Sequence, residues 1–140
     1  MKNTALLIDT NVVLDVMMKR EPFYGDSKRV VQLCIDDEAR GYLAGHTILN
    51  AFFVARKHLT VDERKGLLLF LCRNFVVMDI NNELLIKTLK NEGWQDIEDC
   101  LQAECAKAAK VDYIITRDVK GFEHSGVRAL SPEEFLRIHN

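Results

Sequence analysis

The sequence predicts an α/β protein built on a parallel β-sheet that helices cover on both faces. Its strand-like segments are short and apolar throughout, which is typical of strands buried on both faces. These segments alternate along the chain with segments of helical periodicity, the pattern of a parallel sheet with crossover helices. The 140 residues contain no repeat, linker or low-complexity tract, so we expect residues 1–140 to form a single domain.

The first half of the chain begins with the clearest strand. Ala5–Ile8 is a short apolar run that stops at the turn Asp9-Thr10-Asn11. Two helices are expected next, and the second has apolar residues every three to four positions until Gly41 ends it. A short strand, a helical hairpin and a second apolar strand should follow. The expected segments are Val12–Lys19, Ser27–Arg40, Tyr42–Ala44, Thr47–His58, Val61–Asn74 and Phe75–Ile80.

The second half should contain two helices, two strands and a terminal helix. The last helix is opened by Ser131-Pro132-Glu133-Glu134, which has the pattern of a helix N-terminus. The expected strand Tyr113–Thr116 is followed at once by Arg117-Asp118. The expected helices and strands before the terminal helix are Glu83–Asn91, Ile97–Ala109, Tyr113–Thr116 and Val127–Leu130.

Composition and charge exclude several classes of protein. A content of 48% hydrophobic and 29% charged residues is that of a globular protein, and excludes disordered or fibrous chains. No apolar stretch approaches the ~20 residues that span a bilayer, and Asp9 and Asp15 interrupt the N-terminal apolar run as they would not in a secretory signal. We therefore expect a cytoplasmic protein with no membrane partner. A net charge of −2 means that a polyanion would have to be bound through a local basic patch or a cation.

The cysteines do not have the spacing of a zinc site. No C-x-x-C pair occurs among Cys34, Cys72, Cys100 and Cys105, and all four have apolar neighbours. We expect buried, reduced thiols rather than disulfides or metal ligands.

Acidic residues follow two of the expected strands. Asp9 comes directly after Ala5–Ile8, and Asp118 follows the strand that begins at Tyr113. The carboxyl ends of parallel strands meet at one edge of the sheet, where ligands of open α/β sheets bind. Either residue alone would more often be a turn or helix N-cap residue. The presence of two such residues, on opposite halves of the chain, favours a functional site at this edge of the sheet.

A third acidic element, Asp96-Ile97-Glu98-Asp99, stands at the start of the expected helix Ile97–Ala109. Asp96 and Asp99 are three residues apart and therefore project from nearly one face of the helix. Asp96 is equally consistent with an N-cap that complements the helix dipole. Glu98 lies on another face and is interpreted as a solvated residue.

Convergence of Asp9, Asp99 and Asp118 would create an electrostatic cost. Two carboxylates ~4 Å apart repel by about 4 kcal/mol at an effective dielectric constant of about 20. A cation would offset this repulsion, and ligands that offer only oxygen suit Mg²⁺ or Mn²⁺. Such an ion polarises a phosphoryl oxygen and lowers the pKa of a bound water, as phosphodiester hydrolysis requires.

Three blocks of this sequence, in order and spacing, resemble those of the PIN domain family. The likeness is to its branch of VapC-like toxin ribonucleases in particular, and it covers essentially the whole chain. The blocks are Leu7-Ile8-Asp9-Thr10-Asn11-Val12-Val13-Leu14-Asp15, Asp96-Ile97-Glu98-Asp99-Cys100-Leu101-Gln102-Ala103 and Asp112-Tyr113-Ile114-Ile115-Thr116-Arg117-Asp118.

The resemblance implies a three-layer α/β/α sandwich with a five-stranded parallel sheet. It also implies a Mg²⁺- or Mn²⁺-dependent endoribonuclease, usually paired with an antitoxin protein and often a homodimer. The catalytic, metal-binding acids that it implies are Asp9, Asp99 and Asp118, with Asp96 as an accessory metal ligand.

Four further residues are expected to support the acids. By resemblance, Asn11 and Thr116 position the acids or the attacking water. Arg117, beside Asp118, is a candidate phosphate clamp or an orienting ion pair. Asn50 stands where the family places an Asp or Glu, on the helix after the second strand. Its amide oxygen can coordinate a hard cation, but it brings no charge and cannot act as a base.

Two alternatives follow from these residues. Because of Asn50, the chain could be a weakened or inactive PIN-like protein that binds RNA or an antitoxin-like partner. A phosphatase of the haloacid dehalogenase type also has an Asp after its first strand, but it needs a second Asp two residues later, where this chain has Asn11.

Overall fold

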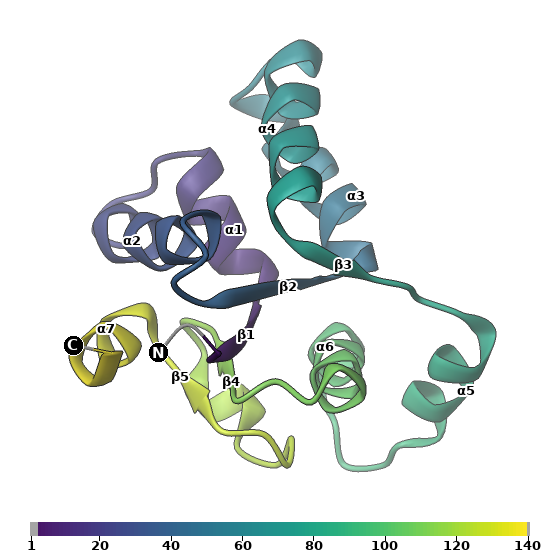
Figure 1. Cartoon of the computed structure of the whole chain (residues 1–140). Helices are drawn as coiled ribbons and strands as arrows, with labels where there is room; N and C mark the ends of the chain where they lie inside the picture. Colours follow the sequence, from purple (N-terminus) through teal and green to yellow (C-terminus); the bar gives the residue numbers. More distant parts are fainter. Residues whose placement is uncertain (1–2, 140) are drawn as a thin grey trace.

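A computed structural model describes residues 3–139 and confirms the expected fold class. Within these residues, five parallel strands form one sheet in the order β3-β2-β1-β4-β5. β1 is central, and its carboxyl end lies beside that of β4 (Figure 1). The strands are β1 (Ala5–Ile8), β2 (Arg40–Ala44), β3 (Val76–Met78), β4 (Tyr113–Ile115) and β5 (Ala129–Leu130).

Helices cover both faces of the sheet and complete the three layers. One core lies under α1 (Thr10–Met17), α2 (Tyr24–Ile35), α3 (Gly45–Val54), α4 (Val61–Asn74) and α7 (Pro132–His139). The other core lies under α5 (Asn82–Lys90) and α6 (Ile97–Ala109). Two short 3₁₀ helices, η1 (Ala55–Lys57) and η2 (Val119–Phe122), follow α3 and β4. No helix within residues 3–139 is both long and apolar enough to cross a bilayer.

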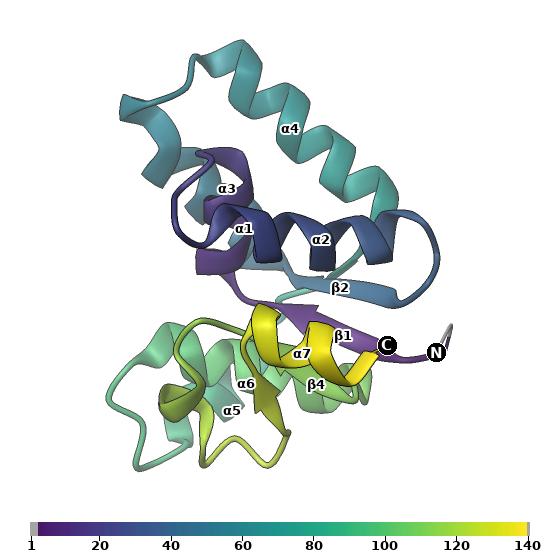
Figure 2. The same cartoon turned by 90° about the vertical axis from the view of Figure 1, so that its left-hand side faces the viewer.

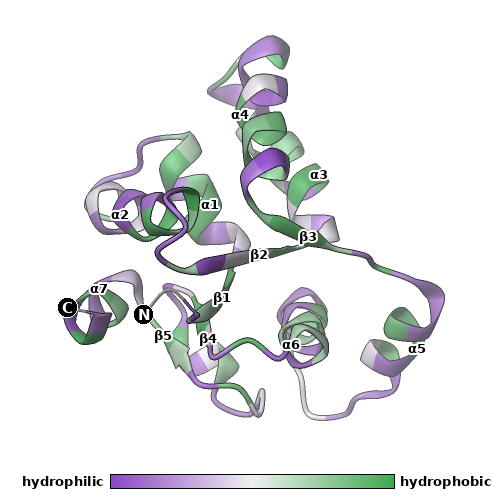
Figure 3. Cartoon of the chain, in the orientation of Figure 1, coloured by the Kyte–Doolittle hydropathy of each residue, from purple (hydrophilic) through white to green (hydrophobic). Residues whose placement is uncertain are grey.

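The central strand explains why β1 is apolar at every position. Leu6 and Ile8 point into the core under α1 and α2, whereas Ala5 and Leu7 point into the core under α6. All four residues are at most 1% exposed, and hydrophobic colour runs along β1 in Figure 3. Successive side chains of a strand alternate between faces, so a strand covered on both faces needs apolar residues throughout.

The end of α2 differs from the expectation. The helix ends at Ile35 instead of Arg40, and Asp37 adopts a left-handed conformation with φ 59°. Gly41, interpreted as the residue that ends the helix, lies inside β2. A Cβ at this position would stand 2.4 Å from the Phe75 ring and 2.8 Å from Cys34 Cβ, so glycine permits close packing there.

One cysteine also differs from the expectation. Cys34, Cys100 and Cys105 are buried, as predicted, but Cys72 is exposed on α4. All four are free thiols. Burial raises the pKa of Cys34 to about 12, so this thiol is unreactive at neutral pH.

Candidate active site

Four chain segments meet at the carboxyl edge of the sheet. Asp9 directly follows β1, and the turn that carries Asp118 follows β4, the neighbour of β1. The N-terminus of α6 brings Asp96 and Asp99 to the same edge. The start of α3, after β2, adds Thr47, whose hydroxyl lies 2.9 Å from that of Thr10.

Asp9 stands at the N-cap of α1, but its carboxylate does not cap the helix. Thr116 Oγ1 donates a hydrogen bond of 2.7 Å to Asp9 Oδ2, and Gln102 Nε2 donates one of 2.6 Å to Oδ1. Burial raises the pKa of Asp9, and these hydrogen bonds only partly offset it. The carboxylate of Asp9 therefore accepts hydrogen bonds from Thr116 and Gln102 and does not cap α1, as an Asp at a helix N-terminus commonly does.

Thr116 connects the two acidic strand ends. Its hydroxyl donates to Asp9 and also accepts a 3.0 Å hydrogen bond from the backbone N–H of Asp118. One buried hydroxyl thus fixes both the carboxylate of Asp9 and the backbone that carries Asp118. Thr116 thus lies between the side chain of Asp9 and the backbone of Asp118, and its positioning role stays a prediction.

Because Gly121 has no side chain, the Asp118 carboxylate can lie directly against its Cα. The Gly121 N–H donates to Asp118 Oδ1 at 3.2 Å, so Asp118 caps η2. A Cβ on Gly121 would lie 2.4 Å from Asp118 Oδ2 and 2.9 Å from its Cγ. This close approach is available only to glycine, and the sequence analysis did not identify it.

A Gly121→Ala substitution should therefore reduce metal affinity with little effect on folding. The added methyl group displaces the flexible carboxylate of Asp118 rather than the backbone, so we expect Tm to change by less than about 3 °C. Affinity for Mn²⁺ should fall by roughly 10- to 100-fold, as when the support of a metal ligand is removed. Isothermal titration with Mn²⁺ measures the affinity, and Gly25→Ala, at a glycine with open space around it, is the control.

Asp96 performs the capping role that was considered for it. Its Oδ1 accepts hydrogen bonds from the backbone N–H groups of Glu98 at 2.9 Å and Asp99 at 3.2 Å. This cap fixes the first turn of α6 and therefore the direction of the Asp99 side chain. Asp96 Oδ2 takes no part in the cap, so capping leaves one oxygen available at the edge.

Asp99 shows that the acidic groups converge. Its pKa is raised to about 7, first by burial and then by neighbouring negative charges. Every neighbouring charge that shifts the pKa of Asp99 is negative. The charges that act on Asp99 are those of Asp9, Asp96, Asp118 and Glu98.

The raised pKa of Asp99 predicts a pH dependence of stability. The folded protein holds this proton up to about pH 7, whereas the unfolded chain releases it near the ordinary value of 3.8. Asp99 therefore costs no stability below about pH 4, and the cost grows until about pH 7, as the pH rises. In EDTA, the Tm of Asp99→Asn minus that of the native protein should increase over this range. A difference that is constant between about pH 4 and pH 8 would contradict the shift.

Arg117, Asn11 and Asn50, which were expected to support the acids, each have a different environment in the structure. Arg117 Nε contacts Asp15 Oδ2 at 2.8 Å, so of its two expected roles the structure shows an ion pair. Asn11 is partly buried, and its Oδ1 is a buried atom with no hydrogen-bond partner among residues 3–139. Asn50 is partly buried on α3, one turn after Thr47 and so on nearly the same helix face.

Sequence reasoning missed two polar residues of the site, one fully buried and one partly buried. Gln102 is fully buried and donates to both Asp9 and Thr10 Oγ1. Its position three residues after Asp99 was a signal, because residues three apart share a helix face. His46, at the start of α3, lies 3.8 Å from Glu98, and burial lowers the pKa of its imidazole.

The donor chemistry of this edge fits a hard divalent cation. The acids offer only oxygen, and buried amide oxygens of Asn11 and Gln102 have no hydrogen-bond partner among residues 3–139. In residues 3–139, however, no three His, Cys, Asp or Glu side chains are already arranged around one point as metal ligands. Because both oxygens of Asp9 accept hydrogen bonds from the protein, an ion would have to join or replace these contacts.

Comparison with known structures supports the fold. VapC20 of Mycobacterium tuberculosis, a sarcin-ricin loop cleaving toxin, is similar with a TM-score of 0.68 and 11% identity, over 87% of this chain and 95% of that one. A toxin–antitoxin complex from Klebsiella pneumoniae gives 0.67 and 18%, over 91% and 97%. VapBC2 of Rickettsia felis, bound to a promoter DNA fragment, gives 0.65 and 13%, over 91% and 98%.

Sequence comparison identifies the family itself. No curated protein matches the chain significantly in sequence. The family model of the PIN domain, by contrast, matches residues 5–120, which include each acid described above. The resemblance stated from the three acidic blocks is therefore confirmed at the level of the family, and the chain belongs to the PIN domain family.

Proposed function

We propose that this protein is a metal-dependent endoribonuclease of the VapC-like toxin type that acts in the cytoplasm. It would hydrolyse RNA phosphodiesters with a water activated at an acidic Mg²⁺ or Mn²⁺ site. The observation that carries the proposal is the placement of Asp9, Asp99 and Asp118 at one carboxyl edge of the sheet, where the neighbouring acids help to raise the pKa of Asp99. Membership of the PIN domain family supports the same activity.

The residues of the chain have distinct tasks in this proposal. Asp9, Asp99 and Asp118 would hold the ion, with Asp96 as an accessory ligand, and the bound ion would polarise a phosphoryl oxygen and lower the pKa of a water. Thr116 orients the carboxylate of Asp9 through a short hydrogen bond. Such support of a ligand typically changes metal affinity or activity by ~10- to 100-fold.

Asn50 provides the direct test of this function. We expect the native protein to cleave single-stranded RNA in Mn²⁺, and Asn50→Asp to bind Mn²⁺ about 10-fold more tightly, because it adds a negative charge near the cation. Cleavage of a labelled oligoribonucleotide and metal titration measure the two effects. Asn50→Ala controls for the loss of the amide, and EDTA for metal dependence.

The same experiment decides between the enzyme and the alternative. A protein that binds RNA or an antitoxin-like partner without cleaving it would show no RNA cleavage in either the native form or Asn50→Asp. Cleavage by the native protein that requires both Mn²⁺ and Asp9 excludes the binding-only alternative.

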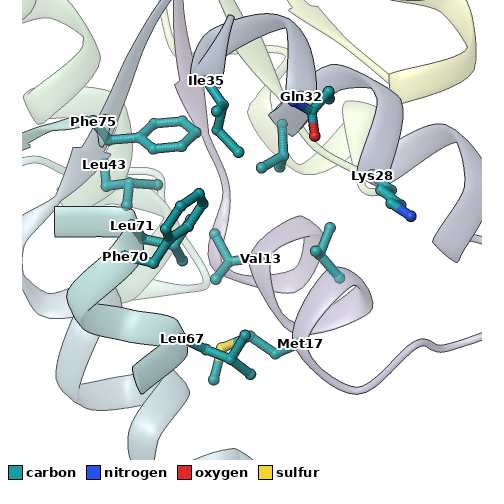
Figure 4. Close-up of a pocket in the computed structure, with 12 residues that line it drawn as sticks. Val13, Met17, Lys28, Gln32, Ile35, Leu43, Leu67, Phe70, Leu71 and Phe75 are labelled. Atoms are coloured by element: carbon teal, nitrogen blue, oxygen red, sulfur yellow. The ribbon is translucent and has the colours of Figure 1, made fainter. Parts of the chain in front are cut away.

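We also propose an antitoxin protein as partner, because two of the similar structures are toxin–antitoxin complexes. An apolar cavity of about 150 Å³ lies between α1, α2 and α4 (Figure 4). Leu67 and Phe70 of α4 border it and are 40% and 48% exposed. Exposed apolar surface of this kind is typical of protein interfaces, and an apolar segment of the partner would fit it.

A homodimer is part of the same proposal. Large apolar side chains of α3 and α5 are exposed to solvent. The most exposed of them are Leu49 and Phe53 on α3 and Leu89 on α5, at 75%, 60% and 70%. Their mutual burial between two copies would remove this surface from water.

A further inference from the structure

A second cavity lies beside the acidic edge, where the starts of α2 and α7 approach each other. These two helices lie one above the other in front of the sheet in Figure 2. The cavity has a volume of about 310 Å³, which is at the lower end of the range for ligand pockets. The lining residues that matter here are Pro22, Phe23, Asp26, Arg117, Pro132 and Glu133.

Arg117 joins this cavity to the candidate active site. It stands between Thr116, which fixes Asp9, and Asp118. Ser131 and Pro132, which follow β5, also line the cavity, so it lies at the same carboxyl edge of the sheet as Asp118. A polynucleotide whose phosphate lies at the acidic edge would have its next nucleoside within reach of the cavity.

A guanidinium and an aromatic ring lie against each other in the wall of the cavity. The Arg117 guanidinium lies over the Phe23 ring, 4.0 Å from its centroid, and Phe23 is 39% exposed. Asp15, which is fully buried, holds Arg117 in place. The only two prolines of the chain, Pro22 and Pro132, both line the cavity, and their fixed φ angles limit its flexibility.

The charges around the cavity do not favour a phosphate. Asp15 is shared between Arg117 and Arg20, so neither guanidinium is unpaired. The carboxylate of Asp26 lines the cavity and would repel an anion, whereas that of Glu133, also in the lining, is ion-paired with Arg137. They are also hydrogen-bond acceptors, which suit the amino groups of a neutral planar ligand.

Resting on the proposed function, we propose that this cavity binds one nucleobase of single-stranded RNA, in a nucleotide next to the cleaved phosphodiester. Unpaired bases are commonly recognised by stacking on aromatic rings and arginine planes. Here the base stacks on the surface formed by Phe23 and Arg117, and its exocyclic amino group donates to Asp26 or Glu133. The cavity therefore selects adenine, cytosine or guanine over uracil at that position.

The first experiment measures base preference at the cleavage site. A pool of oligoribonucleotides of random sequence is cleaved in Mn²⁺, and the new ends are sequenced. The native protein should disfavour uracil at one position beside the cut. Phe23→Ala and Phe23→Leu should lose that preference, whereas Tyr24→Ala, at the adjacent aromatic residue that lines a different pocket, should retain it.

The second experiment removes the base instead of the ring. An abasic nucleotide is placed at each position of one preferred oligonucleotide. At the selected position it should lower kcat/KM of the native protein by roughly 5- to 150-fold, the factor that corresponds to stacking one base. In Phe23→Ala the abasic substitution should have no further effect, because the stacking partner is already absent. A Tm close to the native value shows that the variant is folded.

The outcomes separate this inference from the proposed function. If the native protein cleaves RNA but Phe23→Ala has the same base preference and the same abasic profile, the cavity does not bind a base. If Phe23→Ala loses only the binding of a protein partner, the inference is likewise wrong. If the native protein does not cleave RNA, the proposed function itself fails.

Discussion

Replacing Asp9 with asparagine should abolish the rise in Tm that Mg²⁺ or Mn²⁺ gives the native protein, and should lower RNA cleavage by at least ~100-fold. An ion that binds only the folded state stabilises it by mass action. Asparagine keeps the size of the side chain but removes the charge at the most buried of the four acids proposed as metal ligands. Loss of a ligand should exceed the ~10- to 100-fold cost of losing a residue that merely supports one.

Without metal, replacing Asp9 with asparagine should not lower the Tm. Burial raises the pKa of Asp9, so its ionised form costs stability at neutral pH. In EDTA, Asp9→Asn should therefore melt at or above the native Tm. Thermal melts with and without Mn²⁺ test both statements, and Asp36→Asn, at an exposed residue that ends α2, is the matched control. An undiminished metal-dependent shift in Asp9→Asn would refute the metal site.

Asp15→Ala should have the largest effect on stability, a loss of about 3 kcal/mol in the free energy of unfolding. Asp15 is fully buried and its carboxylate accepts from Arg20 at 3.0 Å, from Arg117 at 2.8 Å and from Ser27 at 3.3 Å. Removing it leaves two guanidinium groups without their counter-charge. Their side chains are 36% and 28% exposed, so water relieves part of the penalty and places the cost at the lower end of that of buried pairs.

Equilibrium unfolding in urea measures this loss. Arg137→Ala is the control, because it removes an ion pair with Glu133 in which both side chains are more than half exposed. Such a surface pair should contribute less than about 1 kcal/mol. If the two variants lost the same stability, the ion pairs of Asp15 would have no structural importance.

Residues close in sequence correctly predicted the helices whose ends they cap. The bounds of α4 and α6 agree with the expectation, because Thr60 and Glu63 form a capping box on α4 and Asp96 caps α6. Gly41 was misinterpreted because its role comes from Phe75, a residue far along the chain that occupies the space of a Cβ. Glycine at the end of a helical pattern has two explanations, and only packing distinguishes them.

In the candidate site, too, local sequence predicts some features, whereas others depend on contacts between residues far apart in the chain. Asp9 and Asp118 could be identified because an apolar strand precedes each of them and the parallel sheet brings the strand ends together. The ion pair of Asp15 with Arg117 could not, because it joins residues 102 positions apart and nothing in the local sequence couples them. Gln102 stood in a block that was identified, but its contact with Asp9 depends on burial between α6 and β1.

The central place of β1 has a consequence for biosynthesis. Asp9 emerges from the ribosome early, but Thr116, which orients its carboxylate, follows 107 residues later. β1 also pairs with β4, so the middle of the sheet stays open until the last third of the chain has been translated. A ribosome-bound nascent chain therefore lacks the assembled acidic edge. The nuclease proposed above would therefore acquire its acidic site only after most of the chain has been translated.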